Sequence, residues 1–492
     1  VGTGANTKTY TAWNTEKVIN LYATFQESDF NQDIGNWNLK NNLTLERTFY
    51  EASSFDQDIS NWDTSKNTSL SHTFASCPLT TDLKTKPVTQ HGYDYNAWDT
   101  SNVTNMNETF KNTLKTSNSY LGYNGDITNW NTSKVGSIRG MFAGVSQKPH
   151  QFNQDISTKE VIVGNDTYIA WDVSKVEQFG VANAYLHQDN HLTLGTFSNN
   201  NMFNQDIGNW EINTGSEVTM KSMFHNSIFN QPIHQKEVTV GTGANTKTYI
   251  AWNTEKVSNF VNTFSESPFN QDISNWDLTS VISTEQMFYR NNQFNQDINT
   301  SIKNVGTGVN AKTYNAWYTP NLTNANSMLS LCTVFNQSLD KWYVGNLVNF
   351  NSGFSSTNLT NQSFSPQSVT LHGGVNYDSW TFNTTCSLLH LFRNSSNFEG
   401  IGLKDWVLTY VRLGKSSSPD FLYGTNLSPN TYNDILINWE SQSPTLHPDL
   451  LSEGPIHIDF GMGASNATPS TPAAQTAKAS LENNYEWTII NA

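Results

Sequence analysis

Tryptophan returns along most of the chain at nearly regular intervals. Successive members of the series lie roughly 24–26 or roughly 32–42 residues apart, the kind of period found in repeat proteins. One unit of this size cannot bury its large side chains alone, so we expect the units to stack. The repeated tryptophans, predicted to form a buried column, are Trp13, Trp37, Trp62, Trp98, Trp130, Trp171, Trp210, Trp252, Trp276, Trp317, Trp342, Trp380 and Trp406.

A five-residue motif, Phe-Asn-Gln-Asp-Ile, precedes many of these tryptophans. It is intact at Phe30–Ile34, Phe152–Ile156, Phe203–Ile207, Phe269–Ile273 and Phe294–Ile298, and it is recognisable at Phe55–Ile59, Tyr123–Ile127, Phe229–Ile233 and Phe335–Leu339. A phenylalanine often follows the tryptophan at a fixed distance. These phenylalanines, which we expect to join the core, are Phe25, Phe49, Phe74, Phe110, Phe142, Phe264 and Phe288.

The order of residues within a repeat predicts its local structure. Trp98–Met106 alternates β-branched and polar residues, which favours a short strand. The residues that follow, up to the phenylalanine, suit one helical or 3-10 turn, and the five-residue motif forms an extended return. The predicted fold is a leucine-rich-repeat-like solenoid with short parallel strands. A plain parallel β-helix is the close alternative.

Five inserts lengthen individual repeats and are predicted to be lateral β-hairpins. In one of them, Lys236–Val240 and Thr246–Trp252 form two alternating runs around a glycine-containing turn. Adjacent strands lie about 4.8 Å apart, so we expect the hairpins to pair side by side into a second sheet. The inserts lie near residues 84–97, 158–170, 234–251, 299–316 and 366–379.

The end of the chain departs from the repeat pattern. Residues 1–412 are interpreted as the array and residues 413–492 as a small α/β cap, which an open array needs. Ser428-Pro429 and Thr471-Pro472 predict helix starts, and a strand is expected over Tyr485–Ile490. Val1–Val18 nearly duplicates Val240–Val257, so residue 1 is expected to fall inside a hairpin of a polypeptide that extends upstream.

Charge and composition argue against several function classes. The net charge of −15 argues against binding to nucleic acid. No apolar run approaches the length of a transmembrane helix. Cys77, Cys332 and Cys386 are far apart, so they indicate neither a disulfide framework nor a metal site.

The repeats resemble the surface repeat of mycoplasma lipoproteins and BspA-like bacterial surface proteins. The likeness rests on Phe-Asn-Gln-Asp-Ile followed by Ser-Asn-Trp-Asp, as in Phe269–Asp277, and on Trp98–Met106. The tail segments Tyr432–Trp439 and Ala479–Ile489 are also similar to the closing segment of many such chains. The resemblance implies an exported, leucine-rich-repeat-like protein at the cell surface, with adhesion as the usual assignment and no shared catalytic residues.

The motif aspartates and one glycine-containing loop are candidate ligand sites. Stacked carboxylates could bind calcium, but we favour local turn contacts and expect no cofactor. Gly241–Thr248 imitates a phosphate loop, yet a strand follows it, which favours a hairpin turn. His187 and His191 are a weak metal-binding pair. The motif aspartates are Asp33, Asp58, Asp155, Asp206, Asp272 and Asp297.

A tyrosine recurs in the second strand of each insert. Such a series could form a contact strip for glycans or proteins, or it could pack the hairpins onto the repeats below. We favour packing. The tyrosines are Tyr10, Tyr95, Tyr168, Tyr249, Tyr314 and Tyr377.

The sequence predicts a non-enzymatic protein at the cell surface or outside the cell. It would mediate adhesion, display or partner interaction through a repeated face that multiplies weak contacts. The expected partners are other protein subunits, surface proteins and glycans. Alternatives are a homopolymeric subunit of a filament or surface layer, and a glycan-binding or glycan-processing solenoid. Only 27 basic residues, widely dispersed, argue against glycan cleavage.

Overall fold

The computed structural model describes residues 13–112, 122–145, 147–181, 195–413, 420–442, 457–459, 469–485 and 487–490. The chain divides into two compact units. The first contains residues 1–176, 199–205 and 240–247, and the second contains residues 177–198, 206–239 and 248–492. The boundaries between the two units fall within the span predicted as the repeat array.

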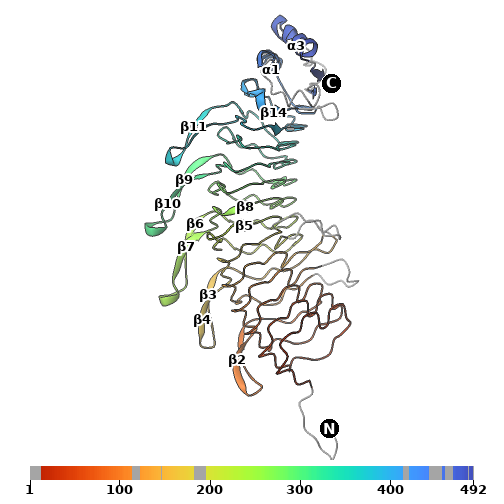
Figure 1. Ribbon diagram of the computed structural model, residues 1–492, viewed down its shortest axis with the longest axis vertical. Coiled ribbons are helices and arrows are strands. Elements are labelled where there is room, and N and C mark those ends of the chain that lie inside the picture. The colour runs from red at the N-terminus through yellow and green to blue at the C-terminus, as the bar shows by residue number, and fades with distance from the viewer. Residues whose placement is uncertain are drawn as a thin grey trace, which may run out of the picture. The chain divides into compact units, whose positions relative to one another are not determined.

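Five antiparallel hairpins lie within the five predicted inserts, and several project as ribbon pairs in Figure 1. Glycine is required at the hairpin turns, because Gly241 has φ +77° and a Cβ there would lie 2.4 Å from the Asn245 carbonyl oxygen. The hairpins are β1 (Lys86–Gln90) with β2 (Tyr93–Ala97), β3 (Lys159–Val163) with β4 (Asp166–Ala170), β6 (Lys236–Val240) with β7 (Lys247–Ala251), β9 (Ser301–Val305) with β10 (Lys312–Ala316), and β11 (Ser368–Thr370) with β12 (Asn376–Asp378).

The prediction of a second continuous sheet is wrong for the described residues, because each hairpin forms its own two-stranded sheet. Side chains join neighbouring hairpins instead. At the turn before β10, Thr307 Oγ1 and Asn310 Nδ2 donate hydrogen bonds of 2.6 Å and 3.0 Å to Glu237 of β6. Thr242 and Asn245 bind Glu160 of β3 in the same way. These side chains occupy the space between hairpins, so the backbones do not reach ladder spacing. We call each contact a tip latch.

Parallel backbone bridges connect successive repeats, but most involve a single residue. In the part of the chain that the structure describes, only β5 (Val218–Thr219) with β8 (Val257–Asn259), and β13 (Cys386–Ser387) with β14 (Val411–Arg412), extend them into strands. The single-residue bridges run through Thr44, Ser69, Asn105 and Ser137 in the first unit and through Asn259, Ser283, Asn324, Asn349 and Ser387 in the second.

The segment between the bridge and the phenylalanine, predicted to be one helical or 3-10 turn, forms a series of hydrogen-bonded turns and no continuous helix. Thr48 N does donate to Leu45 O, as in a 3-10 turn, but Arg47 has φ +55°. The N–H groups of Arg47, Phe49 and Glu51 donate to carbonyls of the next repeat. Backbone groups committed to a neighbouring repeat cannot continue a helix within their own.

The aromatic column is buried as a ladder. Trp252 and Trp276 have ring centroids 6.2 Å apart and planes 2° from parallel. Most of the indole N–H groups reach the preceding repeat, as where Trp276 Nε1 donates to Ile233 O at 2.9 Å. Twelve of the predicted tryptophans are buried, as are six of the seven phenylalanines. Trp13 instead is 78% exposed and Phe25 is half-buried.

A helical segment covers the last repeats of the second unit. Trp439 of α1 (Pro429–Gln442) donates its indole N–H to Leu403 O at 2.9 Å. The second predicted helix start is confirmed, because the Thr471 side chain accepts from Ala474 N at the start of α3 (Pro472–Asn484). The remaining elements are η2 (Gly243–Asn245), η3 (Gly308–Asn310), η4 (His372–Gly374), η5 (Leu403–Asp405), η6 (Leu408–Tyr410), and β15 (His457–Asp459) paired in parallel with β16 (Thr488–Ile490).

Among the described residues, no helix has both the length and the hydrophobicity needed to cross a membrane.

Candidate ligand pocket

The polar residues of the five-residue motif are used between repeats. Asn270 Oδ1 accepts hydrogen bonds from Asn295 N at 2.9 Å and from Gln296 Nε2 at 3.0 Å. Asn31 contacts Asp56 and Gln57 in the same way. The Asn and Gln positions therefore form an amide ladder that links one repeat to the next.

The motif aspartates act inside their own turns. Each Oδ1 accepts from the backbone N–H two residues later, at 2.7–3.0 Å, which is an Asx turn. Among the described residues, no group of three or more His, Cys, Asp or Glu side chains could hold a metal ion. His187 and His191 lie outside the described residues. The aspartates in these turns are Asp33, Asp58, Asp155, Asp206, Asp272 and Asp297.

The phosphate-loop look-alike is a hairpin turn. Gly243–Asn245 forms η2, a 3-10 turn of three residues, and β7 follows it directly. No helix N-terminus faces this loop, so it lacks the feature that lets such loops bind phosphate.

The hairpin tyrosines hydrogen-bond to the repeats beneath the hairpins and do not form an exposed strip. Tyr95, Tyr168, Tyr249 and Tyr314 each donate a hydroxyl hydrogen bond of 2.5–2.6 Å to a backbone carbonyl beside a core tryptophan, and Tyr377 does the same to Lys341 O. Burial raises the pKa of Tyr168 to about 12. Tyr249 and Tyr314 are fully buried, and Tyr10 lies outside the described residues.

A buried carboxylate joins three repeats of the first unit. Glu108 contacts His72 Nε2 at 3.1 Å, Lys111 Nζ at 2.9 Å and Arg139 Nη2 at 3.1 Å. Burial alone would raise the pKa of Glu108, but hydrogen bonding from His72 and the charge of Lys111 hold it well below its ordinary value. Both carboxylate oxygens are taken, so the cluster is a cross-link.

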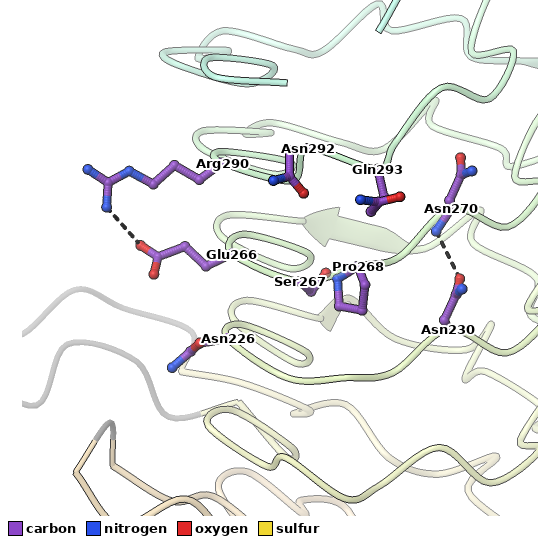
Figure 2. Close-up of a pocket in the computed structure, with 9 residues that line it drawn as sticks. All are labelled: Asn226, Asn230, Glu266, Ser267, Pro268, Asn270, Arg290, Asn292 and Gln293. Carbon is purple, nitrogen blue, oxygen red and sulfur yellow. Dashed lines mark hydrogen bonds and ion pairs between the residues drawn. The ribbon is translucent and has the colours of Figure 1, made fainter. Parts of the chain in front are cut away.

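A pocket of about 580 Å³ opens in the second unit where two turns of different length stack (Figure 2). We call the residues from the last left-handed position of a turn to the first large apolar residue of the next motif the corner link. Glu266–Phe269 has two intervening residues, whereas Arg290–Phe294 has three. The longer link projects beyond the shorter one and leaves a hollow. Residues from three successive repeats line it: Asn226, Asn230, Glu266, Ser267, Pro268, Asn270, Arg290, Asn292 and Gln293.

The same step between a short and a long link is closed elsewhere in the chain. Ser53 Oγ donates to Asp29 Oδ1 at 2.6 Å across one such step. Asn397 Nδ2 donates to Asn358 Oδ1 at 2.7 Å across another. Asp29 and Asn358 occupy the position that Pro268 occupies in its own link. Proline has no side-chain acceptor, so this step stays open.

Some polar side chains of the pocket lining remain available for a ligand. Among the described residues, the Asn292 and Gln293 side chains make no hydrogen bond, and both residues are exposed. Glu266 and Arg290 lie on one side of the pocket in Figure 2 as a loose pair, with 3.8 Å between Oε1 and Nη1. The pocket therefore presents neutral amides beside one compensated charge pair.

A second hollow, of about 630 Å³, lies over the bridges of the second unit. Glu177, Glu217 and Ile282 are among its lining residues, and Glu217 already accepts a 2.6 Å hydrogen bond from Ser258 Oγ. Neither hollow was predicted from the sequence. The signals for the first were the unequal lengths of the corner links and the proline at residue 268.

Comparison with known proteins gives one family. No curated protein and no solved structure matches the chain. A family model described as "Mycoplasma protein of unknown function, DUF285" matches residues 3–86, 84–182, 192–246 and 241–314. These four tandem segments cover more than half of the 492 residues, and the chain therefore belongs to this family of mycoplasma-type repeat proteins.

Proposed function

We propose that the chain is a non-enzymatic repeat protein of the cell surface that displays partner-binding sites on a leucine-rich-repeat-like solenoid. One observation carries this proposal: the side chains that recur in the repeats make their hydrogen bonds within the fold. The Trp indoles, the motif amides and the hairpin tyrosines all bond to neighbouring repeats. What differs between repeats lies at the corner links and hairpin turns, where side chains are exposed.

The solenoid assignment is supported by the contacts between repeats. Parallel bridges, stacked tryptophans and the amide ladder each recur between several pairs of neighbouring repeats. Each contact joins neighbours in the array, which is the arrangement of solenoid proteins.

A location outside the cell is supported by the cysteines. Cys77, Cys332 and Cys386 are buried and free. Burial raises the pKa of Cys386 to about 12, and those of the other two are raised as well. Thiols kept protonated and covered react slowly, so such a chain tolerates an oxidising environment.

Surface labelling of intact cells tests the proposal. In cells that make the protein naturally, we expect an impermeant amine-reactive reagent to label it and added protease to cleave it before lysis. A cytosolic marker protein is the control. Labelling only after lysis would overturn the surface assignment.

Electron microscopy of the protein purified from those cells tests the mode of display. Dispersed particles are expected for an adhesin or display protein. Ordered filaments or a lattice would instead support the alternative that the chain is a structural subunit.

A further inference from the structure

The geometry points to the pocket at Pro268 as a binding site for neutral saccharides. This inference rests on the proposed function and names the ligand class of one displayed site. At the step between the short link of Pro268 and the long link of Gln293, the side-chain pairing seen at Ser53–Asp29 and Asn397–Asn358 is missing.

The available groups suit a ligand with several hydroxyls. Asn292 and Gln293 each offer a carbonyl acceptor and an amide donor, and neither is used within the described chain. Asn270 uses its Oδ1 for the amide ladder, and no hydrogen bond takes up its Nδ2 among the described residues. A planar amide can donate to one hydroxyl and accept from the next one on a sugar ring.

The charges of the pocket favour a neutral ligand. Arg290 is the basic side chain of the lining, and it lies 3.8 Å from the Glu266 carboxylate and 5.1 Å from the centre of the Tyr289 ring. An anion would have to displace Glu266, and a metal ion would find one carboxylate where several oxygens are needed. The lining is mainly polar, which disfavours a lipid chain.

The size of the site is also suitable. Its volume of about 580 Å³ lies within the range of roughly 300–1,000 Å³ that is usual for small-ligand sites. Pro268 lies centrally in the pocket in Figure 2, where it provides a rigid apolar surface for the C–H face of a sugar ring.

An array of immobilised neutral hexose and N-acetylhexosamine oligosaccharides, together with sialylated and sulfated ones, tests the inference with the purified full chain. We expect binding to neutral members. Pro268→Asn restores the acceptor found at Asn358, so Gln293 can bridge the step and binding should fall at least tenfold. Asn292→Ala combined with Gln293→Ala should have the same effect.

Asn397→Ala is the matched control, because it removes an amide from a closed step outside the pocket. Its saccharide binding should equal that of the wild type, and thermal melting of each variant checks that the fold is retained. Pocket variants that fold and bind as the wild type would overturn the assignment, as would no saccharide signal from the wild type. Preference for anionic sugars would overturn the neutral class. If the protein binds no sugar but is still labelled at the cell surface, the saccharide inference is wrong and the proposed function still holds.

Discussion

Trp276 stabilises the array in two ways. Its ring packs in the aromatic column, and its indole N–H satisfies the buried carbonyl of Ile233 in the preceding repeat. The second role explains why tryptophan recurs where another large apolar residue would also fill the space, since an unpaired buried carbonyl is costly.

Two substitutions separate these roles. Trp276→Ala should lower the free energy of unfolding by about 3–5 kcal/mol, as for other large core truncations. Trp276→Phe keeps an aromatic ring but leaves Ile233 O without its donor, so we expect a smaller loss of about 1–3 kcal/mol. Chemical denaturation followed by circular dichroism measures both, and wild-type behaviour of Trp276→Ala would contradict the column.

Glu108 should make stability depend on pH. Its pKa is lower in the folded chain than its ordinary value of 4.5, so the folded state binds fewer protons and stability falls as the pH drops below that value. Glu108→Gln should remove much of this dependence. It should also cost roughly 3 kcal/mol or more at neutral pH, because Lys111 and Arg139 lose their counter-charge.

Denaturation curves between acid and neutral pH measure this effect. Asp434→Asn breaks an exposed pair with Lys404 and is the control, with an expected change below about 1 kcal/mol. Parallel pH profiles for wild type and Glu108→Gln would show that the cluster is not the source.

At the scale of elements, the tip latches couple hairpins that share no sheet. The Glu237 carboxylate accepts hydrogen bonds from the side chains of Thr307 and Asn310 in the next hairpin. The pKa of Glu237 lies below its ordinary value of 4.5. The main cause is the hydrogen bond from Thr307, and the bond from Asn310 adds to it. The latch is therefore complete above that pH and weakens as the pH falls through the lowered pKa.

Removing one latch should loosen one hairpin. In Glu237→Ala, backbone amides near η3 should exchange faster in hydrogen–deuterium exchange mass spectrometry, while global melting stays unchanged because Glu237 and Asn310 are only half-buried and Thr307 is exposed. Ile302→Ala is the control, since Ile302 holds the same strand position without a latch. Equal exchange in Glu237→Ala and wild type would contradict the coupling.

Sequence reasoning worked for elements whose signals are local. The hairpins follow from alternating runs around glycine turns, and α3 follows from Thr471-Pro472. It failed where the outcome depends on the neighbouring repeat. The segment expected to form a helical or 3-10 turn donates several of its N–H groups to the next repeat and so forms no continuous helix. The pocket exists because two links of unequal length stack at Pro268. Spacing within one repeat carries no information about such steps.

At the scale of the molecule, α1 closes the last repeats of the second unit. Trp439 bonds to Leu403 O, and the Gln442 side chain donates to Trp406 O and accepts from Leu408 N. These contacts satisfy backbone groups that a further repeat would otherwise take up. An array without such a cover exposes both apolar surface and unpaired backbone.

Truncation at residue 428 should therefore promote association. Without α1 and the residues after it, the ring of Phe421 loses its contact with Trp439, and Leu403 O loses the indole donor. We expect larger species and a lower melting temperature, measured by size-exclusion chromatography with light scattering and by calorimetry. Deletion of residues 469–492 alone keeps α1 and should have the milder effect. A monodisperse truncated chain with unchanged melting would contradict the capping role.

The tryptophan ladder also gives the protein an optical property. In the second unit, Trp317, Trp342 and Trp380 follow one another at 6.4 Å between ring centroids, with planes 4° and 12° from parallel. Indoles this close exchange excitation energy faster than they emit, so a photon absorbed at one ring leaves from another. Replacing Trp342 by Phe should interrupt this path and change the tryptophan emission of the chain. The continuity of the ladder should therefore be visible in the fluorescence of the protein.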